Sequence, residues 1–243
     1  MVDFSSLAAN GPIKQEPTKR RIRAQLNGQW VVDTLDAVFV WESKYYPVYY
    51  VPVAAVENGP ATVTKNGADS SAAGFTQGQI DVKGTTASVV FFDKGPLAGL
   101  ARLEGVDWFA EDEKLIGGHP KDPYARIECL SSSRRVRVEL RGTVLADSTN
   151  NVFLHESNLR TRHYLSPTAV VDHSVLRPST TTTFCPYKGQ ASYYDVVLAD
   201  GTEVKDGVWY YPIPTAESAP VHGRLAFYNE KFDVFIDGVK EAK

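Results

Sequence analysis

Three residues in the C-terminal half of the chain have side chains that could perform catalysis. Glu156 follows an apolar run, and a half-buried carboxyl there would have a raised pKa suited to a general acid or base. His163 could share the proton transfer, since histidine titrates near neutral pH. Cys185 lies three residues before Lys188, and a thiolate beside an ammonium group is stabilised and nucleophilic. The candidate catalytic residues are therefore Glu156, His163 and Cys185.

Neighbouring side chains could hold a small organic substrate. Arg162 and Lys188 could anchor an anionic or carbonyl group. Tyrosine and tryptophan rings with polar tips commonly line small-molecule sites. The candidate substrate-binding residues are Arg162, Tyr164, Tyr187, Lys188, Trp209, Tyr211 and His222. We therefore predict an aromatic-lined pocket.

The sequence carries no motif for a metal ion or a cofactor. Four histidines lie in the C-terminal half, but their spacing fits no zinc motif, and Cys-x-x-Cys and His-Glu-x-x-His are both absent. Neither the hydrolase motif Gly-x-Ser-x-Gly nor a phosphate-binding glycine loop is present. We expect no metal and no cofactor, which leaves acid–base chemistry or plain binding.

Composition narrows the class of partner. The 243 residues carry a net charge of −3, which gives no reason to expect nucleic acid as a partner. No apolar run approaches the roughly 18 residues of a membrane span, and the N-terminus lacks the pattern of a signal peptide. Two cysteines make no disulfide framework. We expect a cytoplasmic protein whose partner is a small molecule, with neither nucleic acid nor membrane.

An internal repeat determines the expected architecture. Residues 20–56 match residues 134–170 at a constant spacing of 114 (134 − 20). The matches include Arg20-Arg21 with Arg134-Arg135, Asp33 with Asp147, Val38-Phe39 with Val152-Phe153, Glu42-Ser43 with Glu156-Ser157, and Tyr50 with Tyr164. Copies this far apart are expected to be two homologous domains related by pseudo-twofold symmetry. The chain itself is expected to be a monomer or a weak homodimer. The expected segments are an irregular lead-in over 1–18, a first domain over 19–118, a connector over 119–133 and a second domain over 134–243.

The elements of each copy are expected to be strands. Val136, Val138 and Leu140 alternate with charged residues, a period of two that is typical of a half-buried strand. The pair Asn27-Gly28 predicts a tight hairpin turn because both positions tolerate positive φ. Loops rich in small polar residues over 58–78 favour short strands joined by turns, and no long amphipathic helix is indicated. The fold class is therefore mostly β.

The second copy resembles a known family. The segments that carry the resemblance are Glu156-Ser157, Tyr164-Leu165-Ser166-Pro167, Cys185-Pro186-Tyr187-Lys188-Gly189, Trp209-Tyr210-Tyr211-Pro212 and Gly223-Arg224-Leu225-Ala226-Phe227-Tyr228. In this order they are similar to the signature of the domain of unknown function 427 family, in its tandem form. The resemblance implies two tent-like domains of strongly bent antiparallel sheets. It implies no secure activity.

The two copies differ where that signature is densest. Residues 71–75 stand where the second copy has Cys185–Gly189, and Val90-Phe91-Phe92 replaces Trp209-Tyr210-Tyr211. The second copy is therefore the expected host of a site. A cofactor-independent isomerase, cyclase or hydrolase is one interpretation, and a non-catalytic small-molecule-binding or interaction module is the other. Because Glu42 stands at the position of Glu156 in the first copy, a purely structural role for this carboxylate also remains open. Cys185 could likewise be a small buried thiol without a chemical role.

Overall fold

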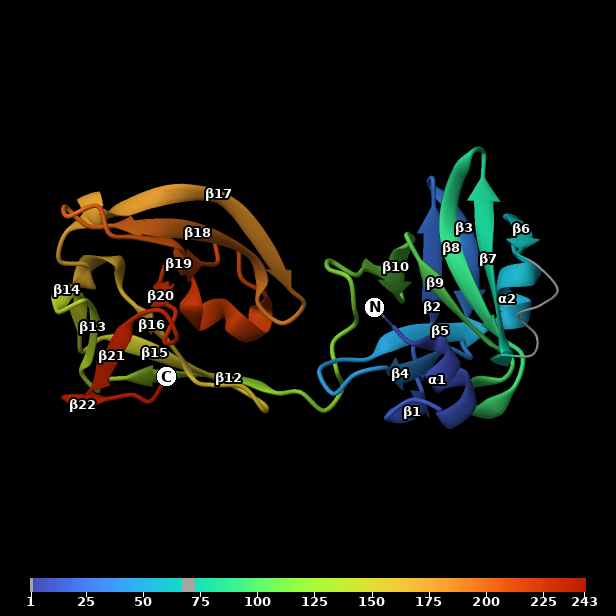
Figure 1. Ribbon diagram of the computed structural model, residues 1–243, viewed down its shortest axis with the longest axis horizontal. Helices are drawn as coiled ribbons and strands as arrows, with labels where there is room; N and C mark the ends of the chain where they lie inside the picture. The colour runs from blue at the N-terminus through green and yellow to red at the C-terminus, as the bar shows by residue number, and fades with distance from the viewer. Residues whose placement is uncertain (1, 67–72) are drawn as a thin grey trace. The chain divides into compact units, whose positions relative to one another are not determined.

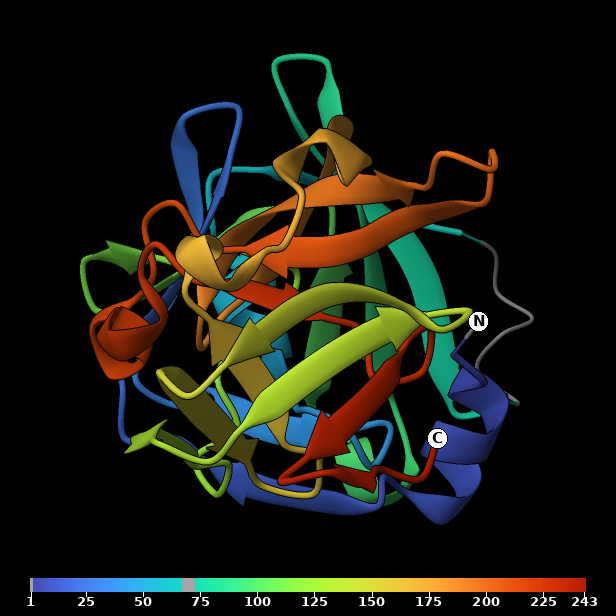
Figure 2. The same ribbon diagram turned by 90° about the vertical axis from the view of Figure 1, so that its left-hand side faces the viewer.

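The computed structural model describes residues 2–66 and 73–243 of the chain. It separates into two compact units, Met1–Asp122 and Pro123–Lys243. Each unit contains one seven-stranded and one four-stranded antiparallel sheet (Figures 1 and 2), so the mostly-β prediction with two similar domains is confirmed.

The elements of the first unit follow one path through its two sheets. The seven-stranded sheet has the order β1 (Lys14–Pro17), β4 (Val38–Trp41), β5 (Val48–Pro52), β9 (Leu100–Glu104), β8 (Thr85–Phe92), β7 (Phe75–Val82) and β6 (Thr62–Lys65). The four-stranded sheet has the order β11 (Glu113–Lys114), β10 (Asp107–Ala110), β2 (Ile22–Leu26) and β3 (Gln29–Thr34). Among the described residues of this unit, the helices are α1 (Phe4–Asn10), α2 (Val53–Glu57) and the 3₁₀ turn η2 (Gly95–Leu97).

The second unit has the same topology. Its seven-stranded sheet has the order β12 (Ile127–Ser132), β15 (Asn151–Glu156), β16 (Arg162–Leu165), β20 (Leu225–Phe227), β19 (Glu203–Tyr210), β18 (Gly189–Val197) and β17 (Leu176–Cys185). Its four-stranded sheet has the order β14 (Thr143–Ser148), β13 (Val136–Leu140), β21 (Asp233–Ile236) and β22 (Val239–Lys240). The 3₁₀ helices are η3 (Pro167–Ala169), η4 (His173–Val175) and η5 (Ala216–Val221).

Strand register shows that the two units are equivalent residue by residue. Val38 pairs with Tyr50 in the first unit, and Val152 pairs with Tyr164 in the second, which preserves the spacing of 114. The predicted hairpin turn at Asn27-Gly28 is also confirmed, because both residues adopt positive φ, as Arg141 and Gly142 do in the second copy.

Two expected boundaries differ from the structure. The lead-in over 1–18, expected to be irregular, contains α1 and β1, and β1 pairs with β4. The connector over 119–133 likewise contains β12, which pairs with β15. Tertiary contacts explain both, since α1 contributes Leu7 and Ala8 to a buried cluster and β1 and β12 cover sheet edges that would otherwise lack backbone partners.

The Gly- and Ser-rich stretch at 58–78 is only partly covered by the structure. Residues 67–72 lie outside the described part of the chain, so the comparison of Ser71 and Ala72 with the second copy cannot be placed. The strands β6 and β7 on either side of it pair in antiparallel register from Thr62 opposite Asp81 to Lys65 opposite Gly78.

The central strands of each seven-stranded sheet bury side chains on both faces. One face packs against the four-stranded sheet of the same unit, and this packing forms the larger core. The other face is covered by α1 in the first unit, while Val221 of η5 joins the equivalent cluster in the second unit. Side chains that alternate along these strands therefore enter two separate environments.

Candidate functional site

The strands β15 and β16 send the predicted catalytic residues to opposite faces of their sheet. Leu154 and Tyr164 lie in the cluster beside η5, whereas Phe153, which pairs with His163, lies in the core between the sheets. Glu156 follows the alternation of Leu154, so its side chain is on the η5 side, away from the ring of His163. The structure therefore does not bring Glu156 and His163 together.

Glu156 forms a half-buried ion pair with Lys188, which comes from the turn between β17 and β18. Cys185 ends β17, and its carbonyl accepts a hydrogen bond from the backbone N–H of Lys188 at 3.2 Å. The charge of Lys188 instead acts on Cys129, where burial raises the thiol pKa and the ammonium partly offsets that effect. The ammonium group of Lys188 is thus engaged by a carboxylate.

The aromatic residues of this face form a packed cluster. The indole Nε1 of Trp209 donates to the hydroxyl of Tyr164 at 3.0 Å, and the ring of Tyr211 lies 6.5 Å from that of Tyr164. Tyr164, Trp209 and Tyr211 are 0%, 6% and 5% exposed, and burial raises the pKa of both tyrosines. The ring of Tyr164 has no accessible surface, so it borders no space large enough for water. The cavity of this unit described below lies on the other face of the sheet.

Tyr187 and His222 lie at the edge of that cluster. Tyr187 is half-buried, and its carbonyl accepts hydrogen bonds from Thr215 and from Ser218, the latter at 3.1 Å. His222 is exposed, and its backbone N–H closes the end of η5. The backbone of Tyr187 therefore anchors η5, while the ring of His222 faces solvent.

Arg162 links the aromatic face to the opposite face. Its guanidinium lies over the rings of Trp209 and Tyr228 at 5.6 and 5.7 Å. It donates to Glu230 at 2.8 and 2.9 Å and to the side-chain oxygen of Asn229 at 3.1 Å. Because Asn229 in turn donates to Glu241 at 2.6 Å, Arg162 belongs to a polar network that ends at His163.

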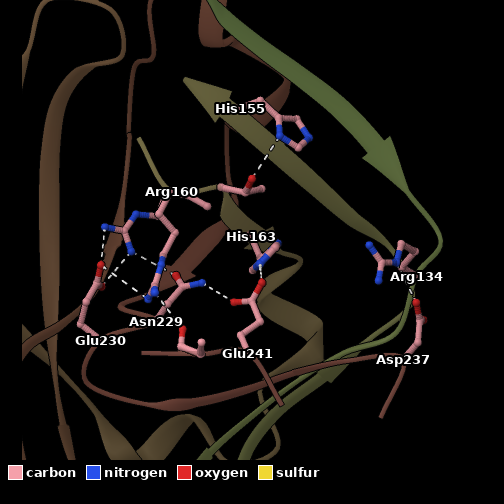
Figure 3. A network of polar contacts seen from close by, with 11 residues as sticks. Arg134, His155, Arg160, His163, Asn229, Glu230, Asp237 and Glu241 are labelled. Carbon is pink, nitrogen blue, oxygen red and sulfur yellow. Dashed lines mark hydrogen bonds and ion pairs between the residues drawn. The ribbon is translucent and has the colours of Figure 1, made fainter. Parts of the chain in front are cut away.

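His163 has the geometry of an oriented general base. Its Nε2 lies 2.9 Å from Glu241, whose other oxygen accepts from Asn229 (Figure 3). An ionised carboxylate can only accept, so the neutral ring carries its proton on Nε2 and leaves a lone pair on Nδ1. The ring is 5% exposed, and its Nδ1 has no hydrogen-bond partner within the described residues.

The electrostatic surroundings of His163 favour the neutral ring. Burial lowers its pKa most, and the charges of Arg134 and His155 lower it further. The hydrogen bond and charge of Glu241 act in the opposite direction. His163 is therefore held neutral near pH 7, the form in which Nδ1 can accept a proton.

A cavity of about 450 Å³ adjoins His163 on this face. It is lined by Arg134, Phe153, His155, Thr161, His163, Ile236, Asp237, Val239, Lys240 and Glu241. Within it the Nδ1 of His155 lies 3.1 Å from the hydroxyl of Thr161. The walls thus combine an apolar side with two imidazoles and with charged groups of both signs.

Sequence reasoning missed Arg134, Glu241 and Asn229 as site residues. Arg134 could have been found, because it opens the second copy of the repeat just before a clear strand. Asn229 directly follows Tyr228 and belongs to the segment that carries the family resemblance, so this signal could have found it. Glu241 carries no local signal, since it lies 78 residues after His163 (241 − 163). Only the folded sheet places it beside His163.

Among residues 2–66 and 73–243, no three histidine, cysteine or acidic side chains converge as a metal site would require. Within the same residues, no helix combines the length and apolar character needed to cross a membrane.

Comparison with known proteins places the chain in a family. No curated protein matches it. A family model described as a domain of unknown function (DUF427) matches residues 14–106 and again residues 128–238. These two matches cover most of both units, so the chain belongs to the DUF427 family and carries its domain in tandem.

Proposed function

We propose that the second unit binds a small organic molecule in the cavity beside His163 and that His163 transfers a proton in its conversion. The observation that supports this most is the His163–Glu241 pair at 2.9 Å, with a buried Nδ1 that has no partner within the described residues. A buried polar atom without a partner costs free energy, so it calls for an occupant or a role.

The arrangement suits cofactor-independent acid–base chemistry. Glu241 orients the ring and stabilises the imidazolium that forms when Nδ1 takes a proton. Asn229 holds the second oxygen of Glu241, so the carboxylate cannot rotate freely. An isomerisation, cyclisation or hydrolysis that begins with removal of a proton from the ligand fits these residues.

A non-catalytic binding module is the second candidate. Arg134 and His155 offer hydrogen-bonding groups to the same cavity, and these serve binding alone equally well. The two candidates differ in whether His163 changes the bound molecule or only contacts it.

Native mass spectrometry followed by turnover assays separates these candidates. We expect a small molecule to co-purify with the full chain and the wild type to convert it once it is supplied in excess. His163→Ala and Glu241→Gln should each lower the conversion rate by about 100-fold or more, while the bound mass persists. His173→Gln, a change at an exposed histidine in η4, serves as the matched control.

Each contrary outcome has a definite meaning. Conversion at the wild-type rate by His163→Ala would contradict the proton-transfer role. Binding without conversion by the wild type would favour the non-catalytic module. If nothing co-purifies and no added small molecule shifts the His163 resonances, both candidates fail.

A further inference from the structure

The guanidinium group of Arg134 lies beside the His163 cavity. Its Nε donates to Asp237 at 2.7 Å, and the other oxygen of Asp237 accepts the backbone N–H of Arg135 at 2.9 Å. Asp237 is thereby fixed and in turn fixes the guanidinium. Among residues 2–66 and 73–243 the two terminal nitrogens of Arg134 have no partner, and in Figure 3 they lie on the side toward His163.

The other charged groups at this cavity already have partners. Lys240 pairs with Asp233 at 3.0 Å. Glu241 uses one oxygen for His163 and the other for Asn229. Arg134 therefore retains the largest unused capacity to bind an anion, with the ring of His155 as the next available group.

We infer that the ligand of this cavity is a small organic carboxylate. The terminal nitrogens of a guanidinium form a fork that matches the two oxygens of a carboxylate. Phe153, over whose ring the guanidinium of Arg134 lies at 5.9 Å, and Ile236 provide an apolar wall for the rest of the molecule. This assignment rests on the part of the proposed function that places a small organic molecule in this cavity.

The first unit contains a matched position that should not bind. Arg20 is the counterpart of Arg134 and lies over Phe39 at 5.8 Å. There the ring of Tyr49 stacks on Phe39 with centroids 5.3 Å apart, in the position that His163 occupies in the second unit. A cavity of about 580 Å³ in the first unit is lined by Tyr49, Trp108 and Leu115, but Arg20 is not among its lining residues.

Titration with benzoate and benzamide, followed by NMR of histidine side chains in the full chain, tests the assignment. The two probes share a ring and differ in charge. We expect benzoate to shift the His163 and His155 resonances and to bind at least about tenfold more tightly than benzamide. Arg134→Gln should remove most of that preference, whereas Arg134→Lys, which keeps the charge but loses the fork, should remove part of it.

The outcomes distinguish a wrong ligand class from a wrong site. Equal binding of both probes, with shifts at His163, would overturn the carboxylate assignment and leave the cavity standing. No shift at either histidine with either probe would overturn the assignment and the proposed function together. Equal losses in Arg20→Gln and Arg134→Gln would show that benzoate responds only to general charge, which also overturns the assignment.

Discussion

Tyr49 in the first unit and His163 in the second occupy the same place in the same pair of strands. Tyr49 pairs with Phe39, and His163 pairs with Phe153. The residue that faces His163, Glu241, is replaced in the first unit by Leu115. The equivalence follows from matching backbone bonds, from Leu115 N to Trp108 O at 2.7 Å and from Glu241 N to Val234 O at 2.8 Å.

Two neighbouring positions also carry larger aromatic side chains in the first unit than in the second. The first unit has Trp41 and Trp108 where the second has His155 and Val234. In the first unit the ring of Trp108 packs against that of Tyr49 at 5.7 Å. Both copies thus border a cavity at this place, but its walls differ. Tyr49, Trp108 and Leu115 line it in the first copy, whereas His163, His155 and Glu241 line it in the second. A duplicated fold can hold a site in one copy because the backbone alone does not decide what fills it.

A second difference concerns Glu42 and Glu156, the half-buried carboxylates on the other face of each seven-stranded sheet. Glu42 pairs with Arg102 on β9 and accepts from the hydroxyl of Tyr50 at 2.9 Å. Glu156 pairs instead with Lys188. The hydroxyl of Tyr164, the counterpart of Tyr50, accepts from Trp209. The carboxylate is retained in both copies, while its cation comes from a different part of the sheet.

Removal of the buried cation is expected to have the largest effect. Arg102→Met should destabilise the first unit by about 3–5 kcal/mol because it leaves Glu42 buried without its cation. Lys188→Met should cost the second unit less, about 1–3 kcal/mol, because Lys188 bonds a single carboxylate whereas Arg102 also pairs with Glu104. Hydrogen exchange resolved by unit measures each loss separately. A larger loss from Lys188→Met would reverse this ranking.

The next largest effects are expected when Tyr49 and His163 are each replaced by the residue of the other unit. Tyr49→His should cost the first unit about 2–4 kcal/mol, because a smaller ring leaves a void between Phe39 and Trp108. His163→Tyr should remove the imidazole from the cavity of the second unit and narrow it, and should therefore weaken the benzoate-induced shift at His155. Denaturation monitored by exchange and the NMR titration check these two results. A neutral Tyr49→His would mean that Tyr49 does not fill the equivalent space.

The smallest expected effect is a pH dependence confined to the second unit. His163 has a pKa below its usual value of 6.5 in the folded state, so the unfolded chain binds more protons in the interval between the two values. The contribution of His163 to the free energy of unfolding is therefore complete above pH 6.5 and is lost as the pH falls toward its pKa in the folded state. Unfolding free energies at pH 7.5 and pH 5 should differ less in His163→Gln than in the wild type. An unchanged difference would exclude His163 as the source.

Much of the fold could be predicted from residues close together in the chain. The repeat at a spacing of 114 indicated two similar domains, and alternation in Val136–Leu140 indicated a strand that the structure contains as β13. The strand β1 could not be predicted, because it lacks an apolar alternation and is specified by pairing with β4. Local patterns report local structure, whereas edge strands depend on partners distant in sequence.

The candidate site was predicted only in part. His163 and Arg162 were both selected by residue type, but Glu156 was grouped with His163 and proves to lie on the other face of the sheet. Trp209 and Tyr211 were expected to line a pocket and are instead almost fully buried. An aromatic stripe has the same appearance in sequence whether it lines a cavity or fills a core.

The amino-acid sequence by itself determined that this chain contains two copies of one β domain and that four of its five histidines lie in the second. Only the tertiary structure decided which side chains meet. Glu241 reaches His163 across 78 residues of chain (241 − 163) because β22 folds back beside β21, and Arg134 joins them through Asp237. Such contacts arise from long-range strand pairing, which depends on the register and packing of the whole unit.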